Sequence, residues 1–114
     1  EILALQSLVP RVPTADHVID FAVRLVRASR PQESSIPEIR DYVTFGAGPR
    51  ASQSLILAAK ARAVLAGRYA AETDDVEAVA HPVFRHRLVK NFRADADRID
   101  PAALIGALLT HIRP

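Results

Sequence analysis

Residues 48–67, GPRASQSLILAAKARAVLAG, predict a long helix and, with it, an all-α fold. Pro49 suits the first position of a helix, and Gly67 suits the position just past the end of one. Apolar side chains cover most of the helix surface, and only a narrow strip around Gln53 and Lys60 is polar. A helix that is apolar nearly all round is expected at the centre of a bundle.

An amphipathic helix is expected upstream, over residues 14–30. Thr14 is a candidate N-cap, and Pro31 disfavours the helical conformation for the residue before it. A polar loop at 31–37 and a short helix at 38–43 follow. The residues that share the apolar face of the upstream helix are Val18, Phe21, Ala22, Leu25, Val26 and Ser29.

Shorter helices are expected downstream of the long one. Thr73 is a candidate cap, Pro82 is expected to interrupt the helix that follows, and residues 83–89 can form one further short helix. Residues 91–98 resemble a polar loop, and Asp100 before Pro101 opens a last helix. Its apolar side chains are Leu104, Ile105, Leu108, Leu109 and Ile112. The chain is therefore expected to be a small bundle of five to six helices.

Length and composition exclude several classes of protein. The 114 residues make one domain, and 49% hydrophobic with 25% charged residues is typical of a globular domain. The apolar run at 55–59 is far shorter than the roughly 18 residues of a membrane span. The absence of cysteine excludes disulfides and thiolate metal sites. With no methionine and no secretory leader, we expect a cytoplasmic piece of a longer protein, in which residues 1–13 are a connector and 14–114 the domain.

The charge pattern is compatible with a second function, that of a binding module. The chain has 15 basic residues, mostly arginine, and 13 acidic ones, so its net charge of +2 is slight. Residues 85–98 are the densest basic stretch. A free-standing helical module that binds nucleic acid or another protein through this stretch is therefore one possible function, although a general nucleic-acid stripe is weakly supported.

Several catalytic motifs are missing. Neither Lys60 nor Lys90 follows a glycine or precedes a serine or threonine, so the chain has no phosphate-binding P-loop. No serine lies in a nucleophile elbow. His81 and His86, five residues apart, would point about 140° away from each other on a helix. We therefore expect surface histidines, no metal site and no nucleotide hydrolysis by this chain alone.

The unusual feature is the turn Gly46-Ala47-Gly48-Pro49-Arg50. With Gly48 as cap and Pro49 as the first helical residue, Arg50 lies in the first turn of the long helix. A cation there meets the positive end of the helix dipole and loses about 0.3–1 kcal/mol. Free amides, the dipole and a guanidinium together would suit a phosphate. A solvated arginine that extends past the helix end is the alternative, and the spacing does not decide between them.

Five blocks of sequence stand out: GAGPRASQ at 46–53, AKARA at 59–63, GRY at 67–69, DDV at 74–76 and PVFRHRL at 82–88. Taken together, they closely resemble the C-terminal lid of MoxR-family AAA+ ATPases, in the family's order and spacing. The upstream LVRASRP at 25–31 is also similar to it. Two departures are small: Gly48 stands where serine is usual, and Phe84 where leucine is commoner.

The resemblance implies a lid that closes over ATP and Mg²⁺ held by an AAA+ core of the same chain. Arg50 occupies the position of the family's sensor-two arginine, a catalytic group in the assembled ATPase, and Gly48, Pro49 and Arg50 would contact the nucleotide. Tyr42 could stack on adenine, but packing in the core is favoured. The fragment itself is expected to bind no cofactor tightly.

The resemblance also implies partners. These are neighbouring subunits of a ring oligomer and a protein with a von Willebrand factor A domain, in a chaperone-like ATPase that matures partner proteins; no membrane contact is implied. Arg85 and Arg87 could form a subunit contact, but ion pairs with Asp74, Asp75 or Glu77 within the domain are favoured. The role of His86 stays open, and so does the choice between action of Arg50 on its own subunit and on the next.

Overall fold

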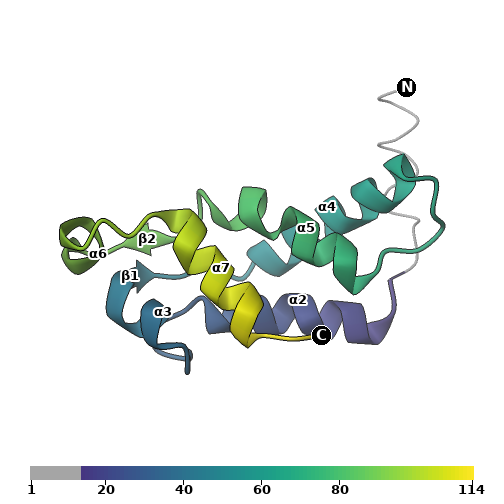
Figure 1. Cartoon of the computed structure of the whole chain (residues 1–114). Coiled ribbons are helices and arrows are strands. Elements are labelled where there is room, and N and C mark those ends of the chain that lie inside the picture. Colours follow the sequence, from purple (N-terminus) through teal and green to yellow (C-terminus); the bar gives the residue numbers. More distant parts are fainter. Residues whose placement is uncertain (1–13) are drawn as a thin grey trace.

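The computed structural model describes residues 14–114 as six helices with one small two-stranded ribbon (Figure 1). The all-α expectation and the expected number of helices are confirmed for these residues; the ribbon was not predicted. The expected connector at 1–13 lies outside the described residues. The elements are α2 (Asp16–Ala28), α3 (Pro37–Tyr42), β1 (Val43–Phe45), α4 (Ala51–Leu65), α5 (Thr73–Phe84), β2 (Val89–Lys90), α6 (Phe92–Ala96) and α7 (Pro101–His111).

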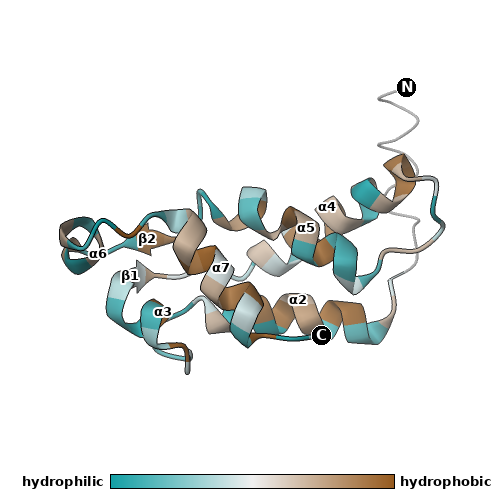
Figure 2. Ribbon diagram, in the orientation of Figure 1, coloured by the Kyte–Doolittle hydropathy of each residue, from teal (hydrophilic) through white to brown (hydrophobic). Residues whose placement is uncertain are grey.

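The core lies where α2, α4, α5 and α7 meet. Helix α7 crosses α2 and α5, and Figure 2 shows hydrophobic residues along these helices, while α3 is mostly hydrophilic. Because every third or fourth residue of α2 is apolar, one face of it is buried, as the sequence predicts. The largest fully buried apolar side chains are Phe21, Phe84, Leu25, Ile36, Ile39, Leu55, Leu104, Ile105 and Leu108.

Helix α4 is not the all-round buried central helix that the sequence predicted. Its buried residues recur every fourth position, at Ala51, Leu55, Ala59 and Ala63. Leu65 is 73% exposed. The prediction failed because an alanine- and leucine-rich helix shows which residues can be buried, whereas the neighbouring elements decide which are.

The end of α4 matches the prediction made from Gly67. Gly67 has a φ of +76°, the left-handed conformation that glycine adopts at little cost. The amide of Arg68 donates to Ala63 O at 2.9 Å and that of Gly67 to Val64 O at 3.0 Å. These two bonds form a Schellman motif, which satisfies the last carbonyls of the helix.

Of the caps predicted at Thr14, Thr73 and Asp100, the first two are wrong and the third is confirmed. Helix α2 begins after Ala15, and Thr14 instead forms an isolated bridge with Ala71. Thr73 is the first residue of α5 rather than its cap, because Glu72 takes that place and donates its amide to Asp75 Oδ2 at 2.8 Å. Asp100 caps α7 by accepting from Ala103 N at 3.0 Å, as expected.

Proline 82 does not interrupt α5. The helix runs to Phe84, and a missing N–H at Pro82 removes only the bond to the carbonyl of Ala78. Both residues are exposed, so water can reach that carbonyl. The expected short helix at 83–89 is therefore wrong, since its first two residues complete α5.

Residues 89–98 also differ from the structure that the sequence predicted. Val89–Lys90 form β2, which pairs antiparallel with β1 through Val43 opposite Lys90 and Phe45 opposite Val89. The expected polar loop contains α6, whose cap Asn91 accepts from Ala94 N at 2.9 Å. The ribbon and α6 form one end of the molecule beside α3 (Figure 1).

Candidate functional site

The turn at 46–50 is fastened to the end of α2 by two side chains. Ser29 Oγ accepts from Ala47 N at 3.0 Å and donates to Val26 O at 2.6 Å. Arg30 Nε donates to Ala47 O at 3.0 Å. Because Ala47 and Ser29 are both buried, these bonds satisfy polar groups that water does not reach. The end of α2 thus fixes the path of the turn.

Arg30 is itself held from the other side. Its Nη1 lies 3.1 Å from Glu33 Oε2, and Arg27 Nε lies 3.4 Å from the other carboxylate oxygen. The hydrogen bond from Arg30 lowers the pKa of Glu33, with a smaller contribution from Arg27. Glu33 is therefore negatively charged at neutral pH and orients the guanidinium that contacts Ala47.

Gly46 lets the turn approach α2 closely. A Cβ atom at this position would lie 2.3 Å from Ser29 O and 2.7 Å from Arg30 Cα, both of them backbone atoms. At Gly48 a Cβ would meet no atom within 4 Å. The turn therefore needs glycine at 46 for steric reasons, whereas the departure from serine at 48 is sterically free.

Arg50 immediately precedes α4, as its N-cap residue. The helix begins at Ala51, so the prediction that Gly48 is the cap and Pro49 the first helical residue is off by two positions. The cause is that Ala51 N bonds to Gly48 O in a turn, before the regular helical bonds begin. Arg50 still has helical backbone angles (φ −76°, ψ −10°), so the side chain stays at the positive end of the dipole.

The Arg50 side chain is exposed, and within residues 14–114 it makes no hydrogen bond and no ion pair. No acidic residue lies in the first turn of α4. Gly48 and Pro49 are exposed as well. Among the described residues, the Arg50 guanidinium is therefore an exposed cation without a partner. It lies on a turn that Ser29 and Arg30 fix to the end of α2.

The Tyr42 side chain contacts the core and residues of the α6 region. It is half-buried against the core, its hydroxyl donates to Asp97 Oδ2 at 2.8 Å, and the Arg93 guanidinium lies 5.8 Å from its ring centroid. The bond to Asp97 raises the pKa of Tyr42 above its usual value. These contacts join α3 to α6.

The expected ion pairs of Arg85 and Arg87 with the acids of α5 are wrong. Since α5 is continuous, Arg85 and Arg87 lie past its end, and Arg85 is about 12–17 Å along the helix axis from those acids. Arg87 instead donates through Nη1 to Val83 O at 2.7 Å and through Nη2 to Ser54 Oγ at 3.2 Å. Arg87 therefore contacts the first turns of α4 through Ser54, which is four residues after Arg50 in the sequence.

A buried carboxylate that sequence reasoning missed joins α4 to α5. Asp75 is fully buried, and its oxygens accept from Arg62 Nη1 and Arg68 Nη1, each at 2.7 Å, and from Arg68 Nη2. The hydrogen bonds from Arg68, the backbone amide of Glu72 and Arg62 lower the pKa of Asp75 to about 2, against the desolvation that opposes them. Asp75 therefore holds two cations in place.

The sequence held a signal for this cluster. Arg62, Arg68 and Asp75 lie in three of the blocks that carry the family resemblance, but Asp75 was expected to pair with Arg85 or Arg87. The two arginines are 13 and 7 residues before Asp75, and a helix ends between them and Asp75. Such ion pairs follow no helical periodicity, so the sequence pattern does not reveal them. The cluster supports the fold at the far end of α4 from Arg50.

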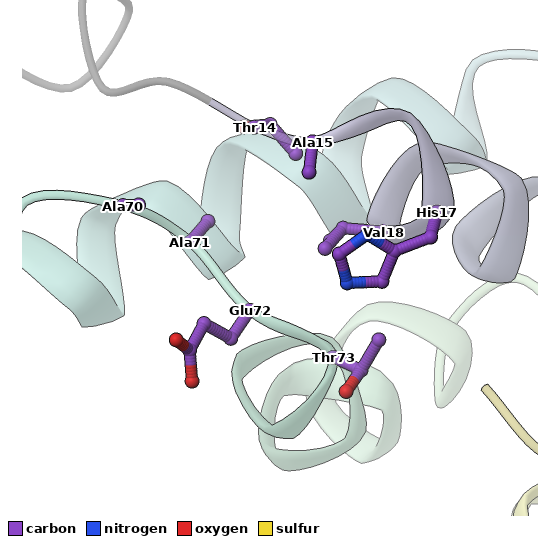
Figure 3. A pocket seen from close by; sticks show the side chains of 8 residues that line it. All are labelled: Thr14, Ala15, His17, Val18, Ala70, Ala71, Glu72 and Thr73. Atoms are coloured by element: carbon purple, nitrogen blue, oxygen red, sulfur yellow. The ribbon is translucent and has the colours of Figure 1, made fainter.

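A cavity in the described part of the chain also lies at that far end. It has a volume of about 450 Å³ and is lined by the starts of α2 and α5 and the residues before them (Figure 3). His17 and Thr73 border it, together with Val18 from the core. Because α4 is about 22 Å long, this cavity is separate from the turn at Arg50.

Within residues 14–114, no group of three or more histidine, aspartate or glutamate side chains could hold a metal ion. His17, His81 and His86 are all exposed. None of the helices in this part of the chain is both long and apolar enough to cross a membrane.

Comparisons with known proteins agree with the arrangement of these elements. Residues 37–106 match the AAA lid domain family. The chain is 36% identical over 110 residues to the protein named Chaperone MoxR1 from Mycobacterium tuberculosis, covering 96% of this chain and 29% of that protein.

A solved structure gives the same result in three dimensions. The crystal structure of a protein described as a candidate ATPase from Cytophaga hutchinsonii superposes with a TM-score of 0.88 and 27% identity, covering 94% of this chain and 33% of that one. The chain thus spans about a third of the length of each of these two relatives. It belongs to the AAA lid domain family and is a helical lid domain of the MoxR type.

Proposed function

We propose that this domain closes over ATP bound by an AAA+ core and that Arg50 is its sensor-two arginine, contacting the terminal phosphate. The observation that carries the proposal is the exposed Arg50 guanidinium, without a carboxylate partner in the described residues, at the start of a helix whose first turn lacks acidic side chains. Such a guanidinium can donate to phosphate oxygens without first breaking an ion pair.

The anchoring of the turn supports a coupling role. A phosphate held by Arg50 would pull on the turn at 46–50, and the bonds from Ser29 and Arg30 to Ala47 would pass that displacement to α2. The lid would therefore move as one body with the terminal phosphate, and its angle would report whether that phosphate is present.

The residues fit a nucleotide phosphate but offer no magnesium site. Gly48 and Pro49 are exposed beside Arg50, so a phosphate can approach the backbone of the turn. Since the described residues include no cluster of carboxylates for a cation, we assign Mg²⁺ to the core. Magnesium bound there would neutralise charge on the phosphates; Arg50 would orient the terminal one and stabilise its developing charge.

The residues around Tyr42 determine how adenine could stack on its ring. Adenine stacking on Tyr42 would require the base to displace Arg93 or to use the opposite face of the ring. The bond to Asp97 and the packing against the core account for Tyr42 without a nucleotide.

The parent protein is proposed from the relatives. We infer that residues 1–13 connect the lid, residues 14–114, to an AAA+ core, and that the assembled protein is a cytoplasmic ring-forming ATPase. The name Chaperone MoxR1 supports a chaperone-like role. From the family resemblance we further propose that this role is the maturation of partner proteins and that one partner carries a von Willebrand factor A domain. The 114-residue chain alone is expected to be monomeric, to lack ATP turnover and to bind nucleotide with a Kd above about 1 mM.

The experiment is Arg50→Ala in the full-length parent. We expect ATP turnover to fall at least about tenfold, because a charge-assisted contact in the transition state contributes more than the 1.4 kcal/mol of one tenfold step. Thermal stability should change by less than about 0.5 kcal/mol, as at other exposed sites.

Arg40→Ala is the matched control. Arg40 is an exposed arginine on α3, and its side chain makes no polar contact within the described part of the protein. Arg68 cannot serve, because it holds the buried Asp75. Normal turnover of Arg50→Ala, or a loss that follows unfolding of the lid, would refute the assignment.

A further inference from the structure

Two acid-free stretches of sequence meet at the start of α4. Neither residues 42–71 nor residues 78–94 contain an aspartate or glutamate. The first stretch holds Arg50, and the second holds Arg85 and Arg87. The bond from Arg87 to Ser54 joins them in space. Neither stretch therefore supplies an acidic residue to balance these arginines.

Arg87 is fixed in this position. Nη1 donates to Val83 O and Nη2 to Ser54 Oγ, so the guanidinium is held at two points. Ser54 lies one helical turn after Arg50, on the same face of the helix, and its amide donates to Arg50 O at 3.0 Å. The second guanidinium thus lies beside the first turn of α4 with hydrogen-bond donors to spare.

Six of the twelve arginines in residues 14–114 have a carboxylate partner within 4 Å, and Arg50 and Arg87 are among the six that do not. Arg24, Arg62 and Arg93 are typical of the paired group, with aspartate partners within 4 Å. Among residues 14–114, neither Arg50 nor Arg87 has such an ion pair. An anion bound at the start of α4 would be attracted to both guanidiniums.

We propose that Arg87 is a second arginine that contacts the terminal phosphate of the nucleotide, beside Arg50. This inference rests on the proposed function of Arg50. The bonds to Val83 and Ser54 orient the Arg87 guanidinium in advance, so that little side-chain freedom is lost when the phosphate binds.

The competing account is purely structural. Val83 lies near the end of α5, and an arginine there stabilises exposed carbonyls and the negative end of the dipole. In that role, loss of Arg87 would lower the stability of the domain and would weaken the binding of ATP and ADP equally. If Arg87 contacts the terminal phosphate, its loss would weaken the binding of ATP and not that of ADP.

The test measures nucleotide affinity of the full-length protein with Arg87→Gln. We expect the Kd for the slowly hydrolysed analogue ATPγS to rise about tenfold, the size of one charge-assisted hydrogen bond, and the Kd for ADP to stay within about twofold. Arg87→Lys, which keeps the charge, should restore part of the ATPγS affinity. Should Arg87→Gln not fold, Arg87→Met supplies the same measurement.

Arg85→Gln is the control, because Arg85 is exposed, carries the same charge and makes no side-chain hydrogen bond or ion pair in the described residues. Equal weakening of ATPγS and ADP, no weakening of either, or the same effect in Arg85→Gln would overturn the role of Arg87. Measuring Arg50→Ala alongside separates the two proposals. If Arg50→Ala loses the preference for ATPγS and Arg87→Gln does not, only this inference fails; if both variants keep it, the proposed function fails too.

Discussion

The hydroxyl of Ser29 and the amide of Ala47 are joined by a buried hydrogen bond of 3.0 Å. Eighteen residues separate them, and the bond connects the last turn of α2 to the turn that precedes Arg50. The same hydroxyl donates to Val26 O, so Ser29 cannot rotate away without losing both partners. The position of Arg50 therefore depends on a serine of another helix.

Ser29→Ala should destabilise the domain by about 1–3 kcal/mol, because it leaves the buried amide of Ala47 without an acceptor. Chemical denaturation of the 114-residue chain measures this loss. Ser35→Ala, at an exposed position of the following loop, should change the free energy of unfolding by less than about 0.5 kcal/mol. Equal effects of the two variants would show that the bond contributes nothing specific.

Gly46→Ala should disturb the turn much more than Gly48→Ala. The added methyl at 46 would overlap Ser29 O and force the turn away from α2, whereas at 48 it would meet open space. We expect a loss of about 1–3 kcal/mol for Gly46→Ala, as for other overpacked positions. Gly48→Ser, which creates the residue more usual in the family, should be close to neutral. A Gly46→Ala variant as stable as Gly48→Ala would contradict the close approach.

Asp75→Asn should destabilise the domain by about 3 kcal/mol, because it removes the carboxylate that holds Arg62 and Arg68 together. Asp74→Asn is the neighbouring control, since Asp74 is exposed and interacts mainly with the dipole. Urea unfolding at pH 7 compares the two. A loss at position 75 no larger than at position 74 would mean that the cluster is not a stabilising feature.

The same carboxyl predicts how stability depends on pH. The pKa of Asp75 is about 2 in the folded domain and about 3.9 in an unfolded chain. Because folding lowers it, the stabilisation is complete above about pH 5 and is lost as the pH falls towards 2, to an extent of roughly 2 kcal/mol. The stability difference between the wild type and Asp75→Asn should therefore shrink over this range. A difference that stays constant down to pH 2 would show that Asp75 is not the group responsible.

Local patterns predicted the parts of the fold that depend on local interactions. The apolar face of α2, the end of α4 at Gly67 and the start of α7 at Asp100 follow from periodicity and from capping, which involve residues a few positions apart. The ribbon could not be found this way. Its strands have only three and two residues and exist because Val43 and Lys90, far apart in the chain, lie side by side.

The candidate site was predictable in part. The glycine-rich turn and its arginine were evident from the sequence, and Gly48, Pro49 and Arg50 are exposed. The phosphate contact of Arg50 stays a prediction. The contacts that fix the turn were not evident, since Ser29 has the right spacing for a core position and its bond to Ala47 depends on packing. Arg87 was expected to pair with acids that a continuous α5 places out of reach.

The most direct test is a structure of the full-length protein with a slowly hydrolysed ATP analogue. The measurement is the distance from the Arg50 guanidinium to the nearest oxygen of the terminal phosphate, on its own subunit or a neighbouring one. The account predicts about 2.7–2.9 Å, the length of a charge-assisted hydrogen bond, with the bonds from Ser29 and Arg30 to Ala47 preserved. An Arg50 that remains in solvent, or pairs with a carboxylate of the core while nucleotide is bound, would contradict it.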